Sequence, residues 1–144
     1  MYTLLFMSAH VWLISLKNLD DDARDIKLGE VAGLELGQGQ RKFVGDPLRM
    51  MLLGLEEASR FPYVMDSDGS AVGVVTLQAG AARAAGWDDD DSAWLLRGFL
   101  VDRRDQGRGL GAAAAAAAVR EAARLTTALG GDQRGVVLSV NEAN

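Results

Sequence analysis

Apolar residues occur along this chain in short runs, which polar and glycine-rich segments separate. Five runs have the length and composition of β-strands, and they cover residues 10–17, 61–65, 71–78, 93–101 and 135–140. Helical spacing of apolar positions, or strong helix formers, predict helices over residues 21–31, 47–59 and 110–129. Strands and helices therefore share the chain, and we expect an α/β (α+β) fold.

Residues typical of helix ends support these helices. Asp20 is a candidate N-cap for the first helix, and Asp46 followed by Pro47 is a typical start for the second. Gly130 ends the third helix, as expected for a C-terminal glycine. Four apolar side chains of the second helix share its expected buried face: Leu48, Met51, Leu52 and Leu55.

The order of the elements predicts a mixed β-sheet. Residues 66–70 join the second and third strands as a hairpin, with Gly69 supplying a positive φ. A helix joins the fourth and fifth strands, and such a right-handed crossover makes those two strands parallel. We expect residues 1–144 to form a single domain in which helices flank the sheet, because no linker or repeat divides them.

Composition narrows the classes of function. The net charge is −5 and no cluster of lysines or arginines is larger than the pair Arg103-Arg104, which argues against a nucleic-acid partner. No cysteine is present, which excludes disulfides and thiol nucleophiles and suits a cytoplasmic protein. The single histidine, His10, excludes a histidine-rich zinc site and is interpreted as a surface or strand-edge residue. The apolar start, residues 2–16, is too short for a membrane span.

The segment most informative about function follows the fourth strand. Four charged residues, 102–105, lead into the glycine-rich segment 106–111 (QGRGLG), and seven alanines then begin a helix. Glycine lets the backbone close around a ligand, and a helix start offers free N–H groups and a partial positive charge. This arrangement predicts an anion site, most plausibly for a phosphate or pyrophosphate.

Known glycine loops fit this segment to different degrees. A P-loop needs Lys-Ser or Lys-Thr after its last glycine, and none follows here. The dinucleotide pattern can be forced onto Gly107, Gly109 and Ala112, but four residues separate these glycines from the strand. A plain strand–turn–helix with no ligand is a further alternative.

A third pattern, Gln106-x-x-Gly109-x-Gly111, resembles the Q/R-x-x-G-x-G/A signature of the GNAT superfamily of N-acetyltransferases. The flanking stretch LRGFLVDRRDQGRGLG is similar to that of bacterial members related to spermine/spermidine (diamine) acetyltransferases. Weaker similarity covers residues 37–47, 61–75 and 138–144, so that most of residues 11–144 are included. The resemblance implies transfer of an acetyl group from acetyl-CoA to a primary amine, by direct attack in a ternary complex.

The resemblance also implies roles for individual residues. Main-chain amides of the glycine loop would bind the pyrophosphate, with the Arg108 side chain adding charge, and the end of the fourth strand would bind the pantetheine arm. The implied cofactor-binding residues are Phe99, Leu100, Val101, Gln106, Gly107, Arg108, Gly109, Leu110, Gly111, Ala112 and Asn141. No metal is implied.

Two residues are candidates for catalysis. The Leu100 N–H is expected to polarise the thioester carbonyl and stabilise the oxyanion. Asp102 is a candidate general base, with a cap or turn role as its alternative. The run Asp88–Asp91 is either a solvated loop or a site for a cationic acceptor such as a polyamine, with Asp89, Asp90 and Asp91 as substrate contacts.

The C-terminal residues depart from the family pattern. Members of the family continue past the fifth strand with a helix, whose tyrosine protonates the departing thiolate, and with further strands. This sequence stops at Asn144, so we expect a GNAT-like sheet that lacks the last helix and strands. An uncovered strand edge would favour a homodimer or larger assembly. A CoA-binding protein without turnover, and a phosphate- or nucleotide-binding protein, remain alternative functions.

Overall fold

The computed structural model describes residues 10–37 and 46–138. Its strands are β1 (Trp12–Ser15), β2 (Arg60–Ser67), β3 (Ser70–Gln78), β4 (Trp94–Val101) and β5 (Val136–Leu138). Its α-helices are α1 (Asp21–Ala32), α3 (Pro47–Glu56) and α4 (Leu110–Leu129). Three short 3₁₀ helices complete it: η1 (Leu16–Asn18), η2 (Ala82–Ala85) and η3 (Arg103–Asp105).

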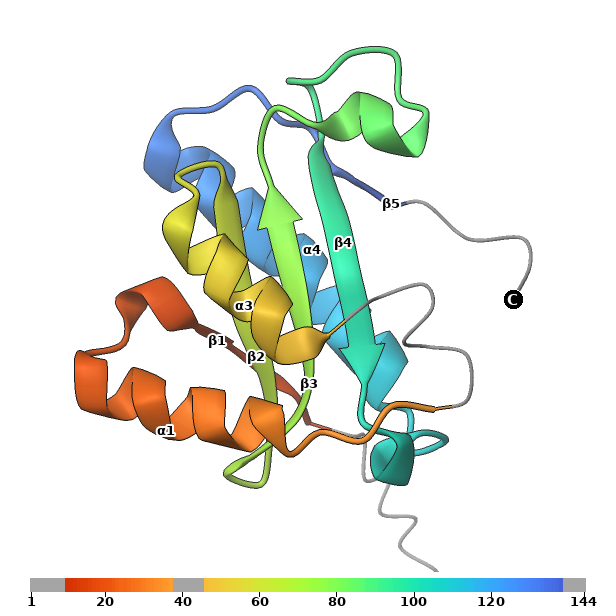
Figure 1. Ribbon diagram of the computed structural model, residues 1–144. Helices are drawn as coiled ribbons and strands as arrows, with labels where there is room; N and C mark the ends of the chain where they lie inside the picture. Colours follow the sequence, from red (N-terminus) through yellow and green to blue (C-terminus); the bar gives the residue numbers. More distant parts are fainter. Residues whose placement is uncertain (1–9, 38–45, 139–144) are drawn as a thin grey trace, which may run out of the picture.

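The strands form one mixed sheet in the order β1-β2-β3-β4-β5. The first three pairings are antiparallel, whereas β4 and β5 are parallel. Helices α1 and α3 cover one face of the sheet and α4 covers the other (Figure 1). The predicted fold class, the hairpin and the parallel crossover are therefore confirmed.

Two hydrophobic cores hold these layers together, one on each face of the sheet. On the α4 face, Trp94 and Leu96 pack with a row of alanines of the helix, including Ala114, Ala118 and Ala122. The small side chains of these buried alanines let α4 approach the sheet closely, whereas Ala112, Ala115 and Ala116 of the same run are exposed. On the other face, Val64, Val74 and Leu100 of the sheet pack with residues of α1 and α3.

The expected helix caps are confirmed. Asp20 Oδ1 accepts from Ala23 N at 2.8 Å, and Asp46 Oδ1 accepts from Leu48 N at 2.9 Å. At the hairpin, Gly69 has φ 85°, as predicted. Within the described ranges, the model contains no helix that is long and apolar enough to cross a membrane.

Some details differ from the predictions. Leu52 is 45% exposed, so its predicted burial is wrong. Helix α3 buries the face centred on Met51 and Gly54, and Leu52 lies about 100° around the helix from Met51. Gly54 lies on the buried face, against Pro62 of β2. A side chain would fit poorly there, because a Cβ on residue 54 would lie 2.9 Å from the Pro62 Cβ. The predicted first strand is shorter and continues as η1.

An irregularity in β4 shapes the edge of the sheet. Val74 pairs with Leu100 and Thr76 pairs with Arg97, so two residues of β4, Gly98 and Phe99, lie opposite Val75. This is a β-bulge, and Gly98 in it has φ 62°. The Met50 side chain of α3 packs where a Cβ of residue 98 would lie. The backbone angle therefore favours glycine at this position, whereas the flexible end of Met50 could move aside for a side chain.

Candidate functional site

The glycine-rich segment forms an open loop between η3 and α4. Gly107 has φ 83° and Gly109 has φ 75°, both in the left-handed region that glycine adopts without strain. A Cβ built on Gly107, Gly109 or Gly111 would meet no atom within 4 Å. The backbone of this loop is thus accessible to a ligand.

Helix α4 begins at this loop without a capping side chain. Its N-cap is Gly109, which makes no side-chain hydrogen bond, and its first main-chain bond runs from Ala113 N to Gly109 O at 3.2 Å. The N–H groups of Leu110, Gly111 and Ala112 consequently precede the first helical bond and have no partner in the described part of the chain. An anion at this end of the helix would satisfy them and would interact favourably with the helix dipole.

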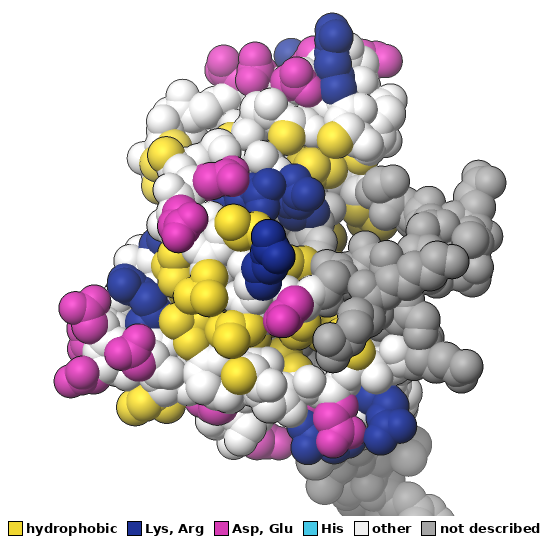
Figure 2. All heavy atoms as spheres, viewed as in Figure 1, with side chains coloured by type: hydrophobic (Ala, Val, Ile, Leu, Met, Phe, Trp, Pro, Cys, Tyr) yellow, Lys and Arg dark blue, Asp and Glu magenta, His cyan; other side chains and the backbone are white. Residues whose placement is uncertain are grey.

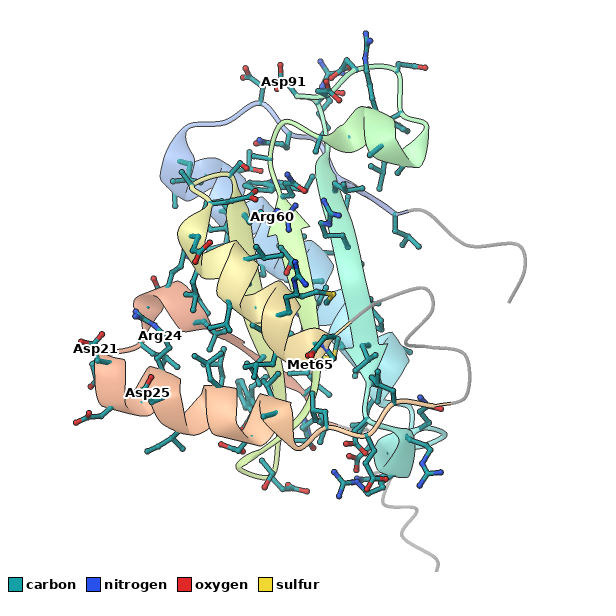
Figure 3. The ribbon with its side chains drawn as sticks, viewed as in Figure 1. Asp21, Arg24, Asp25, Arg60, Met65 and Asp91 are labelled. Atoms are coloured by element: carbon teal, nitrogen blue, oxygen red, sulfur yellow. The ribbon has the colours of Figure 1, made fainter. Side chains whose placement is uncertain are left out.

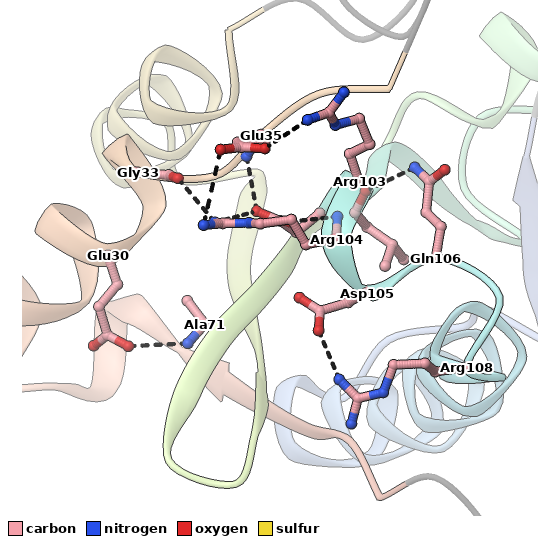
Figure 4. A network of polar contacts seen from close by, with 11 residues as sticks. Glu30, Gly33, Glu35, Ala71, Arg103, Arg104, Asp105, Gln106 and Arg108 are labelled. Atoms are coloured by element: carbon pink, nitrogen blue, oxygen red, sulfur yellow. Dashed lines mark hydrogen bonds and ion pairs between the residues drawn. The ribbon is translucent and has the colours of Figure 1, made fainter.

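Two side chains of the loop make contacts of their own. Arg108 Nη1 lies 2.6 Å from Asp105 Oδ1, and the Arg108 side chain is 53% exposed. Gln106 Nε2 donates to the Val101 carbonyl at 3.1 Å, which ties the loop to the end of β4 (Figure 4). The exposed guanidinium of Arg108 is near the loop and available to a bound phosphate.

Next to the loop, one edge of β4 is unpaired among the described residues. The described part of β5 pairs with Trp94, Leu95 and Leu96. Within residues 10–37 and 46–138, nothing pairs with β4 on this side beyond Leu96. An extended ligand with amide groups could continue the sheet here.

The register decides which amides face this open edge. Asp102 N donates to Val72 O at 2.6 Å. Leu100, two residues before Asp102, pairs with Val74, two residues after Val72. Because alternate N–H groups point to the same edge, the Leu100 N–H points toward β3. This register does not favour the candidate role of the Leu100 amide in polarising a thioester, because by the same alternation the Val101 N–H is the one that faces the open edge.

Asp102 joins the β4–α4 connection to the segment after α1. Its side chain is fully buried, Oδ2 accepts from Glu35 N at 2.7 Å, and Oδ1 accepts from Arg104 N at 2.8 Å. The Arg104 guanidinium also binds this carboxylate, with Nη2 2.8 Å from Oδ2.

These contacts affect the acidity of Asp102. The hydrogen bond from the Arg104 side chain, with those from the Glu35 and Arg104 main chain, lowers the pKa of Asp102 to about 2 despite its burial. A carboxylate so acidic and so fully hydrogen-bonded is a weak base, and the geometry favours the cap and turn role that was its alternative.

The acidic run 88–91 precedes β4, at the opposite end of the strand from the glycine loop (Figure 1). Asp89 accepts from the main chain of Asp91 and Ser92, and from the Ser92 hydroxyl at 2.7 Å. Asp90 Oδ1 accepts from Arg83 N at 3.0 Å. At least Asp89 and Asp90 thus organise their own loop, whereas Asp91 is exposed.

Asn141 and residues 38–45, which carry part of the family resemblance, lie outside the described residues. Two features were missed by the sequence analysis. One is a hollow of about 400 Å³ between β1 and α4, lined by residues that include Trp12, Arg120 and Arg124. The other is a pair of arginines, Arg60 and Arg97, on the α3 face of the sheet. No sequence pattern indicates either feature, because each is formed by residues that are distant in the sequence and close only in the folded chain.

Comparisons with known proteins support the fold. No family model matches the sequence, and no curated protein matches it. Among solved structures, a GNAT family acetyltransferase from Staphylococcus aureus superposes with a TM-score of 0.61 at 12% identity, covering 96% of this chain and 90% of that one. The aminoglycoside N-acetyltransferase AAC(6')-Iy, in complex with a CoA bisubstrate analogue, gives 0.61 at 18% identity, with coverages of 94% and 83%.

A ribosomal-protein-alanine N-acetyltransferase from Brucella melitensis is a third similar structure, with a TM-score of 0.55, 14% identity, and coverages of 93% and 81%. At these identities the likeness establishes the fold, which is that of GNAT acetyltransferases. The resemblance found in the glycine motif and the similarity of the whole backbone are therefore in agreement.

Replacing Asp102 by Asn should lower the free energy of unfolding by about 2–3 kcal/mol, because the buried amide cannot accept all the hydrogen bonds of the carboxylate. The native pKa is depressed, so the stabilisation should be complete above pH ~4 and decline as the pH falls toward 2. Urea unfolding of both proteins from pH 7 to pH 2 measures this difference. Asp105→Asn, which removes the exposed pair with Arg108, is the control and should change stability by less than about 0.5 kcal/mol.

Proposed function

We propose that this protein is an acetyl-CoA-dependent N-acetyltransferase that acts on a primary amine. One observation carries the proposal: an uncapped helix start with open glycines lies directly beside the unpaired half of β4. A single ligand that has a pyrophosphate and an amide-containing arm would satisfy both. Coenzyme A has these two parts, and several structures with this fold are solved with CoA or a CoA analogue.

The residues that would hold the cofactor follow from this geometry. Main-chain amides of residues 106–112 would hold the pyrophosphate, and the exposed guanidinium of Arg108 would add a positive charge. The main chain of Phe99, Leu100 and Val101 would pair with the arm, with the Val101 N–H directed toward the open edge. Bound acetyl-CoA supplies an acetyl group activated as a thioester. The N–H of Phe99, in the bulge, would donate to the carbonyl oxygen of that group.

The acceptor amine must lose a proton before it attacks. An alkylamine has a pKa of ~10.4, so the site must bind its neutral form or remove the proton. Asp102 is fully occupied by Glu35 and Arg104. We therefore infer that water carries the proton away from the amine, and no described side chain is assigned as base.

Binding of the cofactor can be tested by thermal shift. A ligand at ~100 times its Kd should add ~2.7 kcal/mol of stability, so CoA and acetyl-CoA should raise the melting temperature clearly. NAD should not. Gly111→Glu should abolish the shift, because a carboxylate at the helix start repels the pyrophosphate while remaining compatible with the unliganded helix dipole.

Ala116→Glu is the matched control for this measurement. It adds the same charge to an exposed position of the same helix, more than one turn from the loop, and should leave the shift unchanged. If CoA raised the melting temperature equally in Gly111→Glu and Ala116→Glu, the glycine loop would not be the pyrophosphate site. A larger shift with NAD than with CoA would favour the nucleotide-binding alternative.

A polyamine acceptor is the finer prediction taken from the sequence. It is supported by the negative charge of residues 88–91 and by the exposure of Asp91. If these aspartates attract a polyamine, replacing Asp89, Asp90 and Asp91 by Asn should raise the KM for spermidine several-fold without changing the kcat. Steady-state acetylation kinetics measure both constants, and an unchanged KM would exclude this role. A protein that binds CoA but acetylates no amine would be the non-catalytic alternative.

A homodimer is proposed from the edge of the sheet. Strand β5 is the last strand in the order, and Leu138 on it is 53% exposed. Pairing of two such edges would cover apolar surface and unpaired main chain. Light scattering at micromolar concentration should give the mass of a dimer, and Leu138→Lys should shift it toward the monomer. A monomeric wild-type protein would contradict this proposal.

A further inference from the structure

Two arginines, Arg60 of β2 and Arg97 of β4, lie on the face of the sheet that α3 covers, one on each side of β3. Arg60 begins β2 and pairs in register with Gln78 of β3, and Arg97 of β4 pairs with Thr76 of the same strand. The two arginines therefore flank β3, and both lie close to Gln78. Figure 3 shows Arg60 in front of the sheet, beside α3. In Figure 2, basic side chains gather over the middle of this face.

Their charges are only partly neutralised. Arg97 Nη1 donates to Gln78 Oε1 at 2.7 Å, and no carboxylate of the described chain lies within ion-pair distance of Arg97. Arg60 Nε lies 2.9 Å from Glu57 Oε2, yet this nitrogen is buried and has no well-directed hydrogen bond. Glu57, itself 46% exposed, is the one acidic partner of the pair.

Lys17 adds a further positive charge near the two arginines. Lys17 Nζ donates to the carbonyls of Glu57 and Arg60, at 2.7 Å and 2.5 Å. It thus occupies the main-chain acceptors at the end of α3 and contributes a further cation. Burial and the neighbouring Arg60 lower the pKa of Arg97, and the more distant charge of Glu57 offsets this only in part.

Arg97 also lies where β4 and β5 separate. Among the described residues, Leu96 is the last residue of β4 that pairs with β5, and Gly98 begins the bulge just beyond it. A group held by Arg97 would lie on the α3 face, opposite the face covered by α4. Arg97 therefore borders the edge at which the acetyl group would be presented, and Arg60 lies on the same face, across β3 from it.

We propose that Arg60 and Arg97 bind an anionic group of the acceptor, so that the substrate is a primary amine that also carries a carboxylate or a phosphate. This inference rests on the proposed function and specifies its substrate class. Guanidinium groups bind both anions through paired hydrogen bonds. It gives the opposite charge preference from the polyamine prediction, because a polycation would be repelled here.

A structural role alone explains only part of this arrangement. Arg60 could serve to hold Glu57 at the end of α3. Arg97, however, is exposed, makes a single hydrogen bond to an uncharged side chain, and has no acidic partner in the described residues. A purely structural residue at this position would not need a charge beside a second arginine.

The test uses matched ligands that differ only in the anion. N-acetylphenylalanine and N-acetylphenethylamine form the carboxylate pair, and N-acetylphosphoethanolamine and N-acetylethanolamine form the phosphate pair. Calorimetric binding to the full chain, with and without saturating CoA, does not require turnover. In at least one pair, the anionic member should bind ~10-fold or more tightly, as expected for charge-assisted hydrogen bonds, and the pair that shows this preference identifies the anion.

Arg97→Gln should remove the preference, and Arg97→Lys should retain part of it. Arg120→Gln, an exposed arginine on α4, is the control and should leave the preference unchanged. Equal affinity within both pairs, or a preference that survives in Arg97→Gln, would overturn the inference. Its failure is distinct from that of the proposed function, because CoA binding is measured independently of these ligands.

Discussion

The buried carboxylate of Asp102 is the interaction on which the geometry of the candidate site depends. It comes directly after β4 and accepts hydrogen bonds from Glu35 beyond α1 and from Arg104 in η3. It thereby fixes the start of the glycine loop relative to the sheet and to the segment that follows α1. A buried charge is stable only when its hydrogen bonds are satisfied, so this part of the chain can adopt few other arrangements. The loop that follows can remain open because its base is held rigidly.

A second constraint comes from the bulge in β4. An extra residue at Gly98 turns the strand just beyond its last described pairing with β5, and Met50 packs against the glycine from α3. Among the described residues, β4 is thus paired on both sides at its start and on one side only at its end. The unpaired half, the uncapped helix and Arg97 border this region. In the proposed function, the cofactor would bind at this edge and its acceptor on the α3 face.

Two groups of charged residues near β4 suggest opposite charges for the acceptor. The aspartates before β4 are prominent in the sequence, yet Asp89 and Asp90 bind their own loop. The arginines on the α3 face are far apart in the sequence and become neighbours only through the pairing of β2, β3 and β4. The charge that is evident in the sequence and the charge that the fold brings together thus have opposite signs.

The sequence alone determined the fold class, nearly all the strands and helices, the Asp20 and Asp46 caps, and the position of the glycine loop. These features depend on local patterns: alternation, helical spacing, capping residues and glycines that permit positive φ. Tertiary structure decided which amides of β4 are free, because an N–H direction depends on register and on a bulge. It also decided that Asp102 is bound by Glu35 and Arg104, that Leu52 is exposed, and that Arg60 and Arg97 are neighbours. Each of these depends on contacts between residues distant in the chain, which a local pattern does not encode.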